Sequence, residues 1–138
     1  MHLALNHIPV VGIPLLVMML IFGWWRKSNE VVRIALWGVL FLAAAAIAIK
    51  FTGDFAAEQR GRLGAETFIT RHEEAGDQVT TAVFLLGLLA VTGLWLARGE
   101  KPISKWILIL AVAAGLVTSL LYARSAHTGG QISHPELR

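Results

Sequence analysis

The sequence contains no cysteine, and this absence removes several kinds of site at once. Disulfide bonds, covalent attachment of c-type haem and thiolate metal sites are all excluded. A metal ion would have to be held by histidine, carboxylate, methionine or backbone oxygen. The phosphate-binding loop, the nucleophile elbow and the zinc-protease helix motif are also missing, so no common catalytic motif indicates an enzyme.

Charged side chains are scarce within four long apolar runs, which lie at about residues 8–25, 31–49, 79–97 and 103–123. Each run approaches the ~20 residues that a helix needs to cross a bilayer, and 56% of the chain is hydrophobic, with a mean hydropathy of +0.64. We therefore predict one all-α integral membrane domain over residues 1–138, with helices at about 8–25, 31–50, 72–97 and 103–125. Helix interiors without charge disfavour an ion channel or a transporter. We attribute the net charge of +3 to an excess of basic residues in the loops, and we expect no nucleic-acid partner.

The loops differ in charge, and this difference predicts how the chain lies in the membrane. The two short loops, residues 26–30 and 98–105, carry an excess of basic residues, whereas the long loop at 50–77 mixes four basic with six acidic residues. By the positive-inside rule the short loops are cytoplasmic. We therefore expect an up-down-up-down four-helix bundle in the bacterial inner (plasma) membrane, with both termini on the periplasmic side. The five tryptophans fall near the cytoplasmic helix ends, as an interfacial belt does; they are Trp24, Trp25, Trp37, Trp95 and Trp106.

In this topology all five histidines lie at the outer end of the bundle, and they are His2, His7, His72, His127 and His134. Histidine is the commonest metal ligand in proteins. His7 lies where the first helix begins, His72 opens the third helix and His127 follows the fourth, so we expect these three to converge on one outer cavity. Arg71 and Arg124 stand beside them, placed to hold the propionates of a haem.

Other patterns near the outer end predict turns, and predict the conformation of the segments that precede the first and third helices. We expect Gly53 to end the second helix, and the pair Gly129–Gly130 to turn the tail back over the outer face. Residues 2–9 are read as a short helix or an extended lead-in, with a kink possible at Pro14. Residues 66–77 are read as a helical lead into the third helix.

The chain resembles an uncharacterised bacterial family of small four-helix integral membrane proteins, a domain of unknown function. The resemblance is carried by the stretch His2–Pro9, by Thr52–Gly53, by His72 and by Gly129–Gly130, and it covers nearly the whole chain. It implies the four-helix architecture and histidines at the outer face. It supplies no reaction, and the placement of the histidines is similar to that of membrane b-type cytochromes by analogy.

The leading functional hypothesis is a membrane electron-transfer protein that holds b-type haem, more an electron carrier or a subunit than a stand-alone enzyme. His7, His72 and His127 are the preferred iron ligands, with His134 and His2 in reserve. One alternative is a copper, zinc or iron ion held by the same histidines with Glu73 or Glu74. Another is a structural subunit of a larger membrane redox complex. The expected partners are the lipid bilayer, other membrane or periplasmic redox proteins, a quinone in the outer cavity, or further copies of this chain.

Overall fold

The computed structural model describes the backbone of residues 2–60, 66–99 and 101–133, and within them the side chains of residues 8–50, 70–71, 73–99 and 101–130. The described backbone forms four helices, α1 (His2–Trp25), α2 (Asn29–Arg60), α3 (Glu66–Leu96) and α4 (Lys105–Ser133). Each helix packs against the next along the chain, and α4 packs against α1, so the four form a closed ring. The prediction of an all-α four-helix bundle is confirmed.

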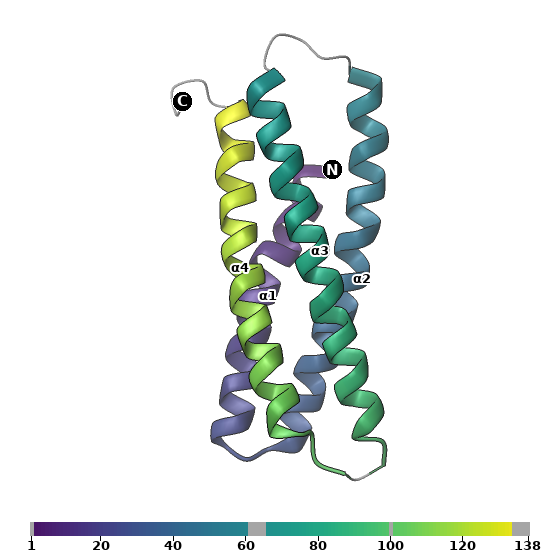
Figure 1. The fold of residues 1–138 in the computed structure, drawn as a ribbon, viewed down its shortest axis with the longest axis vertical. Coiled ribbons are helices and arrows are strands. Elements are labelled where there is room, and N and C mark those ends of the chain that lie inside the picture. The colour runs from purple at the N-terminus through teal and green to yellow at the C-terminus, as the bar shows by residue number, and fades with distance from the viewer. Residues whose placement is uncertain (1, 61–65, 100, 134–138) are drawn as a thin grey trace.

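Helices that follow one another along the chain run in opposite directions (Figure 1). The α1–α2 and α3–α4 connections therefore share one end of the bundle, which we call the short-loop end. The start of α1, the end of α2, the start of α3 and the end of α4 lie toward the other end, the long-loop end (Figure 1). The four histidines whose backbone the structure describes, His2, His7, His72 and His127, belong to these helix ends.

Each helix contains a stretch that is long and apolar enough to cross a membrane, and these stretches are Ile8–Trp25, Asn29–Lys50, Glu73–Leu96 and Lys105–Gly130. The outward faces of the helices are apolar as well. Phe41 and Leu120, for example, are 73% and 72% exposed. In water such a surface would be costly, whereas lipid tails cover it without penalty. The prediction of a multi-pass membrane protein with four spans is confirmed.

The interior is built from aliphatic side chains at helical spacing, with close contacts where glycine allows them. Ile13, Val17 and Leu20 line the inner face of α1, and Val83 and Leu86 belong to that of α3. Gly23 lies where α1 approaches the start of α2. A Cβ atom at that position would stand 2.8 Å from Cγ2 of Val32 and 3.1 Å from its backbone nitrogen. The close packing of α1 on α2 therefore requires glycine here.

The short-loop end is held together by polar contacts between α2 and the α3–α4 connection. Arg33 donates from Nη2 to the backbone carbonyls of Ala97, Gly99 at 2.7 Å and Lys101 at 2.8 Å. These carbonyls lie at and beyond the C-terminus of α3, where a positive charge is favoured. In addition, Ile103 donates its backbone N–H to Oδ1 of Asn29 at 2.9 Å. Arg33, a charged residue near the start of an apolar run, thus holds the α3–α4 connection against α2.

Two expectations about helix ends can be compared with the backbone. Gly53 does not end α2, which continues to Arg60, and the prediction of a turn there was wrong. A single glycine costs a helix about 1 kcal/mol, and the following residues, from Ala56 to Arg60, are good helix formers. The predicted turn at Gly129–Gly130 was also wrong, since α4 continues to Ser133. There both glycines are partly buried, and packing can offset their intrinsic cost.

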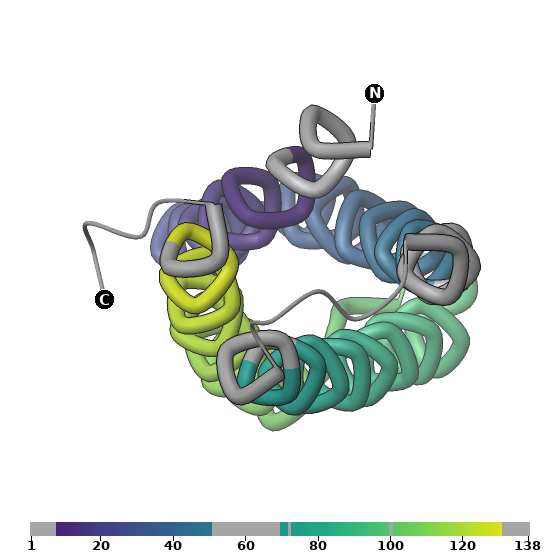
Figure 2. The backbone as a smooth tube through the Cα atoms, turned by 90° about the horizontal axis from the view of Figure 1, so that it is seen from above, coloured from purple at the N-terminus to yellow at the C-terminus, as the bar shows by residue number. Residues whose placement is uncertain are grey.

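In the two segments that precede the first and third membrane spans, the backbone is helical. The stretch before Pro9 belongs to α1, which begins at His2, so the helical reading of that segment holds and the extended one does not. The helix continues through both Pro9 and Pro14. Residues 66–77 form the first turns of α3, as predicted. Viewed from above the long-loop end, the four helices surround a common axis (Figure 2).

Candidate functional site

Two polar contacts at the long-loop end tie α3 to both of its neighbours. Lys50 of α2 forms an ion pair with Asp77 of α3, with 2.6 Å between Nζ and Oδ1. On the other side of α3, Arg124 of α4 donates from Nη1 to Oε1 of Gln78 at 3.3 Å. These four residues form one layer across the bundle, which we call the polar layer. It fixes which residues of α2, α3 and α4 stand at the same height.

The polar layer gives the relative heights of two predicted ligand positions. His127 is three residues beyond Arg124 and therefore about 4.5 Å further out along α4. Position 72 is six residues before Gln78 and about 9 Å further out along α3. The two positions differ by only about 4.5 Å along the axis of the bundle. The structure thus brings the backbone of these two predicted ligands to the same end and to similar heights.

The faces on which these positions lie are different. Position 72 comes three residues before Ala75 and seven before Val79, both of which are buried. These spacings put position 72 on the inward-facing stripe of α3. His127 comes five residues after the buried Tyr122. This spacing directs position 127 away from the interior of the bundle, and the His127 side chain is exposed. The structure therefore places the His127 side chain on the exposed surface of α4 and not in the interior of the bundle.

The remaining predicted residues divide into exposed side chains and side chains that lie outside the described ones. Arg71, Glu73 and Glu74 are exposed near the start of α3, and Arg124 is exposed in the polar layer. His2 and His7 belong to α1 and His72 to α3, but the description covers their backbone alone; His134 lies outside the described residues. Within the described side chains, no group of three or more histidine and carboxylate residues could hold a metal ion.

Two polar side chains lie among the buried residues of α4. Thr118 is fully buried, and its hydroxyl donates to the carbonyl of Ala114 at 2.8 Å. Tyr122 is only 9% exposed, and no hydrogen bond joins its hydroxyl to any residue that the structure describes. Tyr122 lies two residues before Arg124, about 3 Å further into the bundle than the polar layer. The sequence does contain a signal for the burial of Tyr122. Tyr122 continues the helical spacing of the buried Leu108 and Ala111, and therefore lies on the same stripe of α4.

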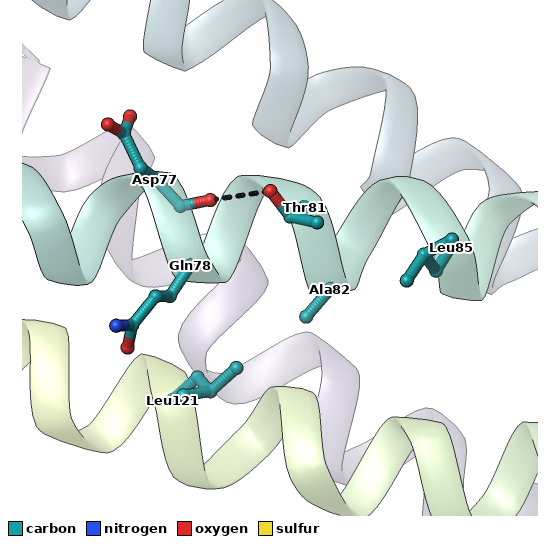
Figure 3. Close-up of a pocket in the computed structure, with 6 residues that line it drawn as sticks. All are labelled: Asp77, Gln78, Thr81, Ala82, Leu85 and Leu121. Carbon is teal, nitrogen blue, oxygen red and sulfur yellow. Dashed lines mark hydrogen bonds between the residues drawn. The ribbon is translucent and has the colours of Figure 1, made fainter.

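A groove opens on the outward side of α3 and α4 beside the polar layer (Figure 3). It has a volume of about 520 Å³, and its lining residues are Asp77, Gln78, Thr81, Ala82, Leu85 and Leu121. Thr81 donates its hydroxyl to the carbonyl of Asp77 at 3.0 Å, so that hydroxyl serves the helix itself. The groove faces away from the stripe that carries position 72. It is therefore distinct from an interior ligand site.

No protein-family model matches the sequence, and no curated protein or solved structure shows significant similarity to it. The resemblance to an uncharacterised family of four-helix membrane proteins stays a prediction.

Proposed function

We propose that the protein is a membrane electron-transfer protein that holds b-type haem at the long-loop end, with His72 as an axial ligand. The observation that carries this proposal is the register of α3. Position 72 continues the buried stripe of Ala75 and Val79, at the height where the membrane span of α3 begins at Glu73. An imidazole on that stripe is suited to bind iron at the rim of the bundle interior.

The second ligand would come from α1. In the described part of the chain α1 packs against α2 and α4 but not against α3, so α1 and α3 stand opposite each other in the ring. Imidazoles on two opposite helices would be able to hold one haem between them. Both histidines of α1, His7 and His2, are therefore candidate partners of His72. His127, on the exposed face of α4, and His134 come after these in the order of proposed ligands.

Three further side chains have a use in this site. Arg71 and Arg124 carry positive charge at the long-loop end, where haem propionates would meet water, and guanidinium pairs well with carboxylate. The hydroxyl of the largely buried Tyr122 would supply a further hydrogen-bond donor. A bound haem supplies one-electron chemistry, while the chain's own residues bind, orient and shield it. The long-loop end would face the periplasm of a bacterial inner membrane, following the positive-inside rule.

The test is an absorbance spectrum of protein purified in detergent after expression with excess haem precursor. We expect a Soret band that is lost in His72→Ala and retained in His127→Ala, a matched change on the exposed face of α4. Elemental analysis of the same samples separates the alternatives. Copper, zinc or iron without a Soret band would replace haem by a non-haem site, and neither haem nor metal in the wild-type protein would reject both.

A further inference from the structure

A second groove lies at the short-loop end, between α2 and α3. It has a volume of about 250 Å³, and it is lined by Trp37, Leu40, Val91, Leu94, Trp95 and Arg98. Five of these six side chains are apolar or indole rings, and Arg98 is the single cation. Its small volume and largely apolar lining suit one flexible hydrocarbon chain.

Arg98 is fixed at the mouth of this groove by Trp95. The carbon of its guanidinium group stands 4.4 Å above the centroid of the Trp95 ring. Its Nε also donates to the backbone carbonyl of Trp95 at 3.0 Å. Within the described part of the chain, the two terminal nitrogens bond to no residue and no carboxylate pairs with the guanidinium. Arg33 differs here, since its Nη2 is already occupied by three carbonyls.

The surroundings of Arg98 are positively charged. Residues 26–33 and 98–105 together contain six basic residues and two acidic ones. A guanidinium that is held in place, has free terminal nitrogens and stands in a positive field favours a phosphate group, which it can bind through two parallel hydrogen bonds. Indole rings such as those of Trp37 and Trp95 favour the headgroup level of a membrane.

We propose that this groove binds an anionic phospholipid, with its phosphate on the terminal nitrogens of Arg98 and one acyl chain along Trp37, Leu40 and Leu94. The dimensions agree with this assignment. Val91 lies five residues before Leu96, the last residue of α3, which is about 7.5 Å along the helix. That length takes an acyl chain from the headgroup level roughly a quarter of the way through the ~30 Å hydrocarbon core. The site does not depend on the haem proposal or on which side of the membrane the short loops face.

Native mass spectrometry of the delipidated protein in detergent tests this site, with phosphatidylglycerol and phosphatidylcholine of identical acyl chains added in turn. The wild-type protein should bind one phosphatidylglycerol in clear preference to phosphatidylcholine. Arg98→Gln should weaken phosphatidylglycerol binding about tenfold, the scale of a lost charge-assisted contact. It should weaken phosphatidylcholine binding as well, because that lipid carries the same phosphate group. Arg26→Gln, which removes a charge at the same end but outside the groove, should keep the preference.

A second variant tests the groove itself. Val91 is exposed, and Val91→Trp would fill the groove without touching the bundle interior. It should weaken binding of both lipids, while glycerol phosphate alone should compete poorly because it lacks the acyl chains. Circular dichroism confirms that each variant is folded. Equal loss of phosphatidylglycerol in Arg98→Gln and Arg26→Gln would mean diffuse attraction to the basic end, and unchanged binding in Arg98→Gln would overturn the site.

Discussion

Arg33 in α2 donates a hydrogen bond to the backbone carbonyl of Ala97, 64 residues later, at the end of α3. The same nitrogen reaches the carbonyls of Gly99 and Lys101 in the following connection. One side chain therefore holds the end of a helix and the turn beyond it against another helix. Because Arg33 is only partly buried, its contribution is smaller than that of an enclosed ion pair.

Arg33→Gln should destabilise the bundle by about 1–2 kcal/mol, since the contacts of a charged donor are lost and the carbonyls at the C-terminus of α3 lose a cation. Unfolding in detergent micelles by increasing denaturant, followed by circular dichroism, measures the change in free energy. Arg26→Gln is the matched control, because Arg26 is exposed in the same end of the bundle. Equal stability of the two variants would contradict the fastening role of Arg33.

Gly23→Ala should destabilise the protein although alanine is the better helix former. The added Cβ atom would stand 2.8 Å from Cγ2 of Val32 and 3.1 Å from its backbone nitrogen, so α1 and α2 must move apart. Such overpacking costs about 1–3 kcal/mol. Gly76→Ala is the control, because a Cβ atom there meets nothing within 4 Å. That change should be neutral or stabilising by up to about 1 kcal/mol, and a thermal unfolding series compares the two.

The contrast between the helix interiors and the helix ends shows what could be predicted from the sequence. The four spans follow from charge-free runs of membrane length, because the cost of burying charge in lipid leaves a strong pattern. The ends of α2 and α4 were predicted from the turn preferences of Gly53 and Gly129. The preference of a single glycine is weak compared with the tendency of the flanking residues to continue the helix. The role of Arg33 required knowledge that the α3–α4 connection passes beside α2, which no local pattern contains.

The candidate site was predicted in part. Grouping the histidines at one end follows from alternating helices, and position 72 fits the inward stripe of α3. His127 was predicted to face an outer cavity from its place near the end of a helix. In the structure five residues of helix separate it from the buried Tyr122 and turn it by more than a right angle, and its side chain is exposed.

Tyr122→Phe should leave the unfolding free energy of the protein without ligand within about 0.5 kcal/mol of wild type, since no described residue bonds to the hydroxyl. Thr118→Val is the comparison, because the Thr118 hydroxyl donates to Ala114. If the Tyr122 hydroxyl serves the proposed haem, loading with haem should stabilise Tyr122→Phe less than wild type. Thermal unfolding with and without haem measures this difference, and an equal gain in both proteins would remove Tyr122 from the site.

The proposed orientation can be tested directly because the chain has no cysteine of its own. Ala126→Cys and Ser104→Cys each introduce one thiol at an exposed position, at the long-loop and short-loop ends respectively. A membrane-impermeant maleimide added to intact spheroplasts should label Ala126→Cys at once and Ser104→Cys only after the membrane is opened. The reverse order of labelling would place the long-loop end in the cytoplasm.

The haem content of purified wild type and His72→Ala, measured as the pyridine haemochrome per polypeptide, tests the central claim most directly. We expect about one haem per wild-type chain and a loss of most of it in His72→Ala, with the variant still folded by circular dichroism. Wild-type protein that carries no haem after haem-replete expression, or a His72→Ala variant that keeps the full amount, would contradict the account.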